Sequence, residues 1–224
     1  MEESAAQVRS RHIRDLGPDL GPVFNLLQND VTWLHARWKL YRQLYARSPE
    51  RVDFLNKVAG HFFGVIQNTL YEDVLLNLAR LTDPPRSGPG QDNLSLRALP
   101  PLIADPALKS AIEALVQSAL NACEAARTWR HKHIAHRDLA LALASISDPP
   151  GAPSRAEIEA ALGAIRAVLD RLEPLAFESF APAGRDADSV VHYLLKGFQA
   201  EEQQLERFRL GKLAPEDLQR EDEI

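Results

Sequence analysis

The chain of 224 residues contains a single cysteine, Cys123. One cysteine cannot form an intramolecular disulfide or supply a cysteine-rich zinc site. The chain also lacks a long hydrophobic run: its longest uncharged stretch, residues 58–71, includes polar side chains and is too short for a bilayer, which needs ~20 apolar residues. The N-terminus carries charges of both signs and no apolar secretory segment. We therefore expect a soluble, cytoplasmic protein with no membrane partner.

The chain has no excess of positive charge: 31 acidic residues outnumber 26 basic ones, the net charge is −5, and the isoelectric point is near 5.8. This net negative charge argues against a protein that binds nucleic acid over its whole surface. The exception is local. Residues Arg127–Asp138, RTWRHKHIAHRD, hold four basic residues and three histidines before their first acid. We call these twelve residues the basic histidine segment.

Proline- and glycine-rich breaks divide the chain, and between them the apolar residues recur with helical rather than alternating spacing. The breaks are residues 16–21, 83–92, 148–153 and 181–184. Residues suited to helix N-caps predict where helices start. These starts are Ser48 before Pro49, Asp105 before Pro106, Ser154 with Glu157 in capping-box spacing, and Asp186.

The helix expected from Pro49 is roughly thirty residues long and carries one apolar stripe, and the helix from Asp105 is expected to run on into the basic histidine segment. The alternating residues 139–146 could extend the preceding helix or form a short extended segment, and we favour a fraying helix. The tail 214–224 is expected to be solvated or loosely docked. The stripe consists of Val52, Leu55, Ala59, Phe62, Ile66, Leu70, Val74, Leu78 and Leu81.

These patterns predict an all-α protein, an antiparallel bundle of about four long helices with extra N- and C-terminal helices. We expect an N-terminal extension (1–19), a helical bundle (20–180), and a C-terminal helix with an acidic tail (181–224). Cys123 falls on an apolar helix face and is predicted to be inert core. Four aromatic residues of the early helix suit core or interface packing, although they could also stack on bases; they are Trp33, Trp38, Tyr41 and Tyr45.

Within the basic histidine segment, Arg130, His133 and His136 are each three residues apart, and on an α-helix they share one drifting face. Trp129 and Ile134 lie away from that face and can anchor it. The arginine fork suits a phosphate, and histidine exchanges protons near neutral pH. This pair suits RNA cleavage without a metal, because the ribose 2′-OH supplies the nucleophile.

A plainer interpretation of the segment is a solvated charge run favoured by the helix macrodipole. A metal site is disfavoured, because no further ligand of matching spacing is apparent and the surrounding charge is positive. We therefore expect neither a metal nor a cofactor.

The spacing of Arg130, five intervening residues and His136 resembles the signature of the HEPN superfamily, helical-bundle domains of which many are RNases. Ala135, His136 and Asp138, together with the upstream residues 78–83 (LARLTD), resemble its abortive-infection (AbiU2-like) branch. The resemblance covers residues ~20–180. It implies a HEPN-like bundle with a role as a toxin or in phage defence.

The resemblance also implies roles for the segment. Arg130 would stabilise the scissile phosphate of an RNA, and His136 would act as general base or acid with His131 in support. The resemblance implies a homodimer in which the two Arg-and-His motifs face each other across one cleft. The positive charges of Lys132, Arg127 and Arg137 would attract RNA. Residues with these roles, together with His133, make up most of the segment.

Asp138 is expected to orient the site or cap the helix. It stands where some HEPN toxins carry a tyrosine that a nucleotidyltransferase modifies, so that type of antitoxin is not expected, whereas another antitoxin or regulatory partner stays open. Asn77 and Arg80 share a polar helix face with Asp73. They could support the site or form an interhelical hydrogen-bond network. A second hypothesis for the whole chain is a non-catalytic HEPN scaffold that binds RNA, nucleotide or a protein partner.

Overall fold

The structure is a computed structural model that describes residues 3–135, 151–173 and 186–212. The chain divides into two compact units. The first comprises Met1–Lys39 and Asn68–Phe180, and the second comprises Leu40–Gln67 and Ala181–Ile224. The expected conformations of residues 139–146 and of the tail lie outside the described residues.

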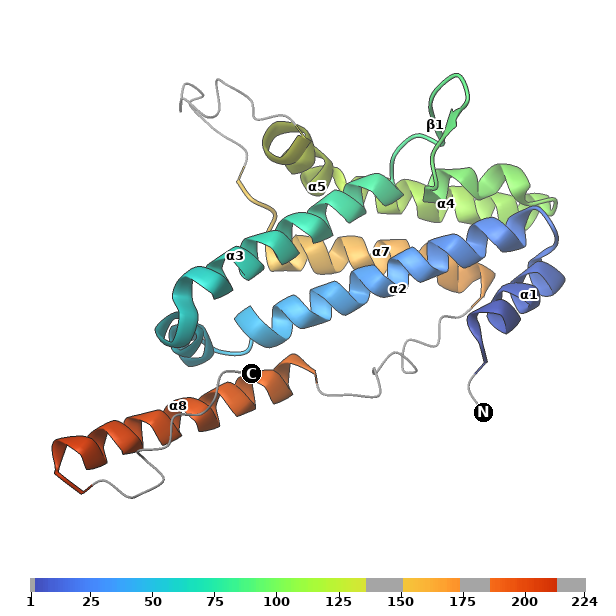
Figure 1. Ribbon diagram of the computed structural model, residues 1–224. Coiled ribbons are helices and arrows are strands. Elements are labelled where there is room, and N and C mark those ends of the chain that lie inside the picture. The colour runs from blue at the N-terminus through green and yellow to red at the C-terminus, as the bar shows by residue number, and fades with distance from the viewer. Residues whose placement is uncertain (1–2, 136–150, 174–185, 213–224) are drawn as a thin grey trace. The chain divides into compact units, whose positions relative to one another are not determined.

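Helices dominate the described chain, and the predicted all-α bundle is confirmed (Figure 1). The long helices are α2 (Leu20–Tyr45), α3 (Pro49–Leu81), α4 (Pro106–Ala122), α7 (Arg155–Leu172) and α8 (Ala187–Arg209), with the shorter α1 (Ala5–Leu16) and α5 (Glu124–Trp129). The other elements are a hairpin of β1 (Arg86–Gly88) and β2 (Gln91–Asp92), two 3-10 turns, η1 (Leu96–Ala98) and η2 (Pro100–Leu102), and the π-helical η3 (Arg130–Ala135).

The predicted helix starts are confirmed by their caps. The Asp105 carboxylate accepts a hydrogen bond from the backbone of Ala107, and the Asp186 carboxylate accepts one from Ser189. Ser154 and Glu157 form the reciprocal capping box that their spacing predicts. Each cap satisfies backbone N–H groups that have no partner inside their helix.

Within the first unit, α2 and α3 run antiparallel, because Asp30 pairs with Arg80 and Arg37 pairs with Asp73. α4 packs along α7. α1 lies close against the start of α2, where Gly21 meets the backbone of His12 and Ile13. His12 is fully buried there, with its Nδ1 2.9 Å from Oδ1 of Asn25. His12 stands alone in the sequence, and in the structure it is a core residue.

The apolar stripe of α3 is not continuous. Ala59 departs from helical geometry with φ −158° and ψ 65°, which kinks the helix inside the second unit. Phe62, which the stripe would bury, is therefore exposed, and Phe63 is buried instead. The periodicity assumed an uninterrupted helix, so it misplaced Phe62 next to the kink, whereas Val74, Leu78 and Leu81 further along are buried as the stripe predicts.

The aromatic residues of α2 divide into two groups. Trp38 is buried, whereas Trp33 is 61% exposed and is no part of the core. In the second unit, the Tyr45 hydroxyl donates a hydrogen bond to the carbonyl of Phe63. Partial burial raises the pKa of Tyr45 to about 12.

In the second unit, acidic residues at the start of α8 hold the turn between α2 and α3. Asp188 accepts hydrogen bonds from Arg47 and Arg51, and Gln43 donates to Asp186. The hydrogen bond from Arg47 and, to a lesser extent, the one from Arg51 lower the pKa of Asp188. None of the described helices is long and apolar enough to cross a membrane.

Gly21 allows the close approach of α1 and α2, and its replacement gives a first prediction. A Cβ at this position would lie 2.5 Å from the carbonyl oxygen of His12 and 2.7 Å from Cα of Ile13. Both are backbone atoms, so α1 must move away. We expect Gly21→Ala to lower the free energy of unfolding by about 1–3 kcal/mol, measured by thermal and denaturant unfolding.

The matched control is Gly163→Ala in the middle of α7. A Cβ there meets nothing within 4 Å, and alanine should stabilise the helix by roughly 0.5–1 kcal/mol relative to glycine. Equal shifts in the two variants would contradict the close-packing explanation.

Candidate active site

The basic histidine segment does not continue α4 as an α-helix. α4 ends at Cys123, whose φ of −89° and ψ of 2° are not helical, and the short α5 then leads into the π-helical η3. The predicted continuous α-helix is therefore wrong. A π-helical turn bonds residue i to i+5, so α-helical spacing no longer places Arg130 and His133 on one face. The remaining predicted residues, His136, Arg137 and Asp138, lie outside the described residues.

Asp83, directly after the end of α3, holds Arg130 through a two-point ion pair. Its Oδ2 lies 2.7 Å from Nη1 of Arg130, and its Oδ1 lies 3.0 Å from Nη2. The same Oδ1 is 3.7 Å from Nη1 of Arg127. A parallel pair of charge-assisted hydrogen bonds fixes the plane of a guanidinium as well as its position. Asp83 therefore orients Arg130.

Arg127 binds the end of α3 by a second contact. Its Nη1 donates to the backbone carbonyl of Thr82 at 2.8 Å. Carbonyls in the last turn of a helix have no intrahelical partner, and the macrodipole favours a cation there. Arg127 of α5 thus places its guanidinium at the carbonyl of Thr82, which the end of α3 leaves without a helical partner.

The charges of this cluster do not balance. Arg127, Arg130 and Asp83 have side chains that are only 27%, 25% and 22% exposed. Among the described residues, one carboxylate accompanies these two guanidiniums, so their cluster keeps a net positive charge in a half-buried position. Burial strengthens the attraction of such a charge for an anion, because water screens it less. The cluster is therefore suited to an anionic ligand.

Trp129 and His133 form a stacked pair beside this cluster. Their ring centroids are 3.7 Å apart and their planes differ by 15°. Trp129 was expected to lie away from the face of His133, and this expectation was wrong, because residues four apart are neighbours on a helix surface. Trp129 Nε1 and His133 Nε2 are buried, and no described residue hydrogen-bonds to them. His131 is exposed and Lys132 is half-buried.

Asn77 and Arg80 belong to a separate network. Arg80 donates to Asp30 at 2.8 Å and to Oδ1 of Asn77 at 3.3 Å, and Asn77 donates to the carbonyl of Asp73. The described contacts of these residues do not reach Arg127 or Arg130. Their role in supporting the site stays a prediction.

The sequence matches the family model HEPN_AbiU2, described as AbiU2, over residues 18–193. This range contains α2, α3 and the whole basic histidine segment. The chain belongs to the AbiU2 family of HEPN domains. The resemblance seen in the sequence is confirmed. No curated protein and no solved structure matches the chain.

Sequence reasoning missed Asp83 as a site residue of this AbiU2-family chain. Asp83 entered the sequence analysis only as the start of a proline- and glycine-rich break. One signal was present, because Asp83 closes the LARLTD stretch that carried the AbiU2-like resemblance. Nothing in the local sequence links it to Arg130, which lies 47 positions further along the chain.

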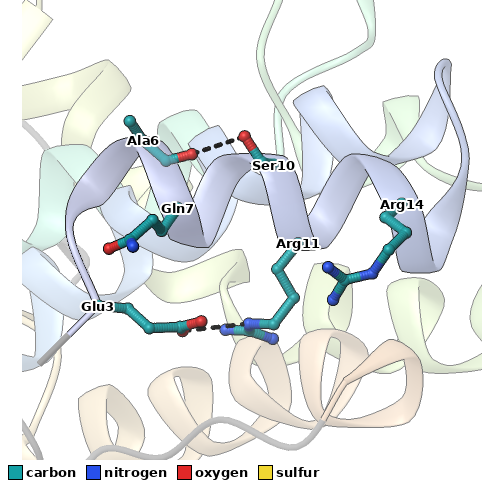
Figure 2. A pocket seen from close by; sticks show the side chains of 6 residues that line it. All are labelled: Glu3, Ala6, Gln7, Ser10, Arg11 and Arg14. Atoms are coloured by element: carbon teal, nitrogen blue, oxygen red, sulfur yellow. Dashed lines mark hydrogen bonds and ion pairs between the residues drawn. The ribbon is translucent and has the colours of Figure 1, made fainter. Parts of the chain in front are cut away.

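Metal-ligating clusters are absent from the part of the AbiU2-family chain that the structure describes. A shallow hollow lies against α1, away from the basic histidine segment in sequence (Figure 2). Two of its side chains, Glu3 and Arg11, pair with each other. None of its lining residues belongs to the segment; they are Glu3, Ala6, Gln7, Ser10, Arg11 and Arg14.

Cys123 lies fully buried at the junction of α4 and α5, which confirms it as a core residue. Burial raises the pKa of its thiol to about 12, although the nearby Arg127 acts in the opposite direction. The nucleophilic form of cysteine is the thiolate, so the folded protein should hold an unreactive thiol.

We accordingly expect the native AbiU2-family chain to resist an aromatic disulfide reagent at about pH 8 and to react fully once denatured. Absorbance of the released thiolate measures both rates. Cys123→Ser, denatured in the same way, gives the zero level. Rapid labelling of the native protein would show that Cys123 is accessible and contradict its place in the core.

Proposed function

We propose that this protein is a metal-independent endoribonuclease that acts as a toxin or phage-defence effector. The supporting observation is the half-buried pair Arg127 and Arg130, which lie at the start of the basic histidine segment and share the carboxylate of Asp83. The same segment contains His136. The AbiU2 family assignment agrees with a role in abortive infection.

Arg130 retains donors for a phosphate. Asp83 accepts one hydrogen bond from each terminal nitrogen, so the Nε–H and the second N–H on each terminal nitrogen remain to donate. A guanidinium that is already oriented loses little freedom when it binds a phosphate, which favours the transition state. Arg127 adds charge but directs one nitrogen to the carbonyl of Thr82.

The reaction requires no external nucleophile. The ribose 2′-oxygen attacks the adjacent phosphorus while a base removes its proton. The bond to the 5′-oxygen of the next nucleotide breaks, and an acid protonates that oxygen. The products are a 2′,3′-cyclic phosphate and a free 5′-hydroxyl. In the proposal, His136 acts as base or acid, His131 assists it, and Arg130 stabilises the phosphorane.

A cleft between two copies belongs to the same proposal. Each copy would contribute one Arg130 and one His136, and doubling a local excess of positive charge would strengthen the attraction for RNA. This arrangement would concentrate charge in a protein that is acidic overall.

The rival function is a non-catalytic scaffold that binds RNA, nucleotide or a protein partner. One observation favours it: both terminal nitrogens of Arg130 already donate to Asp83. An arginine held in this way can serve structure alone. Binding and cleavage must therefore be measured separately.

The main prediction concerns RNA cleavage in the presence of a chelator. We expect the wild type to cut RNA and arrest growth, and we expect Arg130→Ala and His136→Ala to lower the cleavage rate at least about 100-fold. RNA carrying 2′-O-methyl groups should bind without being cut. Gel analysis of end-labelled RNA measures the rate and identifies the cyclic phosphate.

The control is Arg86→Ala, which removes an arginine that pairs with Asp92 in the exposed β1–β2 hairpin. If the two site variants cut RNA and arrest growth as well as wild type, the mechanism is wrong. Salt-sensitive RNA binding with no cut products from any variant would favour the scaffold.

Asp83 gives a second prediction, because we assign it as a positioning residue. Asp83→Asn removes the charge that orients Arg130 but leaves the volume unchanged. We expect the cleavage rate at saturating RNA to fall about 100-fold, since small misplacements have effects of that size. RNA affinity should stay equal or rise, because the loss of a negative charge favours a polyanion.

The matched variant is Asp92→Asn, which breaks the exposed pair with Arg86 and should alter neither quantity. A purely structural role for Asp83 predicts a different result, in which affinity and rate fall together with the melting temperature. Unchanged cleavage by Asp83→Asn would show that Arg130 does not need this orientation.

A further inference from the structure

The stacked rings of Trp129 and His133 come from the two sides of a change in helix type. Trp129 is the last residue of α5, and His133 belongs to the π-helical η3. Arg130 stands at the junction. Its backbone N–H bonds back to the carbonyls of Ala126 and Arg127 in α5, and the wider π pattern begins with it. A π-helical turn next to an α-helix frequently marks a functional position.

The junction at Arg130 is restrained by contacts of its side chains. The π-helix is rare, so a turn of this kind depends on contacts outside its own backbone. The described residues supply two such contacts. Asp83 holds the guanidinium of Arg130 at two points, 2.7 Å and 3.0 Å long. The stack of Trp129 on His133 spans the junction, with ring centroids 3.7 Å apart and planes 15° apart.

These two contacts restrain different parts of Arg130. The pair with Asp83 fixes the far end of the side chain, because two parallel hydrogen bonds set the plane of the guanidinium. The stack fixes the backbone from which that side chain starts, because Trp129 precedes Arg130 and His133 follows it. An arginine has a long and flexible stem, so both ends must be held for its position to be defined.

His133 contributes the face of its ring to this arrangement. Its Nε2 is buried, as is Nε1 of Trp129, and no described residue hydrogen-bonds to either atom. An RNA cannot exchange a proton with a nitrogen atom that it cannot reach. Two flat rings in contact gain dispersion energy and exclude water from their shared faces. His131 differs in this respect, because it is exposed and an RNA can reach it.

We infer that His133 is a positioning residue for Arg130, and that it acts through its stack with Trp129 and not as an acid or base. This inference rests on the proposed function, because stabilisation of a phosphorane requires an arginine that is held in place. The sequence grouped His133 with the charges of the basic histidine segment. Its stacked ring gives it a different task.

The first test compares two replacements of His133 in RNA cleavage by the full chain. His133→Ala removes the stack. We expect kcat to fall between about 10- and 100-fold, because a displaced arginine stabilises the transition state less well. KM should be unchanged, since Arg127 and Arg130 keep their charges. His133→Phe keeps a flat ring but cannot carry a proton, and it should restore most of the lost rate.

The matched control is His192→Ala on α8. His192 is an exposed histidine whose ring meets Tyr193 only edge-on, with centroids 5.9 Å apart and planes 68° apart. Its removal should change neither kcat nor KM. Melting temperatures of all variants show whether a loss of rate accompanies a loss of the fold.

The second test asks whether His133 acts through Arg130. In a background of Arg130→Ala, the further change His133→Ala should not slow cleavage, because both losses act through one side chain. If the two losses multiply instead, His133 acts independently of Arg130 and the inference is wrong.

The third test needs no RNA, and it separates this inference from the proposed function. In nitrogen-15-labelled protein, the indole N–H signal of Trp129 reports on the ring stacked against it, and the Nε–H signal of Arg130 reports how firmly the guanidinium is held. Trp129→Phe and Arg130→Ala assign the two signals. His133→Ala should shift the first signal and broaden the second, and His133→Phe should restore the signal of Arg130.

Undiminished cleavage by His133→Ala would overturn the inference. A His133→Phe variant as slow as His133→Ala would overturn it too, because the imidazole itself would then take part in the reaction. If the wild type does not cut RNA, the proposed function fails and the signal of Arg130 decides: no change in His133→Ala refutes the positioning role, and broadening that His133→Phe reverses supports it. If His133→Ala does not fold, Trp129→Leu removes the same stack and replaces it in each test.

Discussion

The contact on which the candidate site depends is the shared carboxylate of Asp83. An acid at the C-terminal end of α3 opposes the helix macrodipole, and two half-buried arginines would each be costly without an anion. The arginines thus compensate the negative charge at the end of α3, and Asp83 compensates part of their positive charge. Because Asp83 and Arg130 lie 47 positions apart, this pair joins the end of one bundle helix to the segment after α5. Among the described residues it leaves one positive charge of the cluster without an acid, and such a charge suits an anionic ligand.

Electrostatics separates two surfaces that are close in the sequence of α3. Arg80 belongs to the ion pairs that join α2 to α3, and Asp83, three residues later, belongs to the cluster with Arg127 and Arg130. Charges cancel on the first surface and do not cancel on the second. A protein with a net charge of −5 can therefore hold a local excess of positive charge at one place and balanced ion pairs at another. Overall charge describes neither surface.

The helical periods, caps and breaks predicted the fold well, because they report local backbone preferences that the bundle does not override. Local patterns failed where a long-range constraint intervened. Phe62 is exposed next to the kink at Ala59. The π-helical turn that begins at Arg130 removes Arg130 from the helix face of His133. The role of Asp83 was equally hidden, since a sequence gives no sign of which arginine an acid will meet. The basic histidine segment itself was visible because its composition differs from the rest of the chain.

The two ion pairs at the end of α3 have a thermodynamic consequence. Arg80 pairs with Asp30 of α2, and Asp83 pairs with Arg130 of η3, so a movement of the end of α3 affects both contacts. If binding of a second copy shifts this helix end, it changes the affinity of Arg130 for phosphate by some factor. Linkage then requires that RNA changes the affinity between the copies by the same factor. The direction of this coupling depends on whether self-association strengthens or weakens the hold of Asp83 on Arg130. A stronger ion pair with Asp83 would orient Arg130 better but would compete more strongly with a phosphate. Under the proposed mechanism, phosphate affinity and the cleavage rate of bound RNA therefore respond to the same movement with opposite signs.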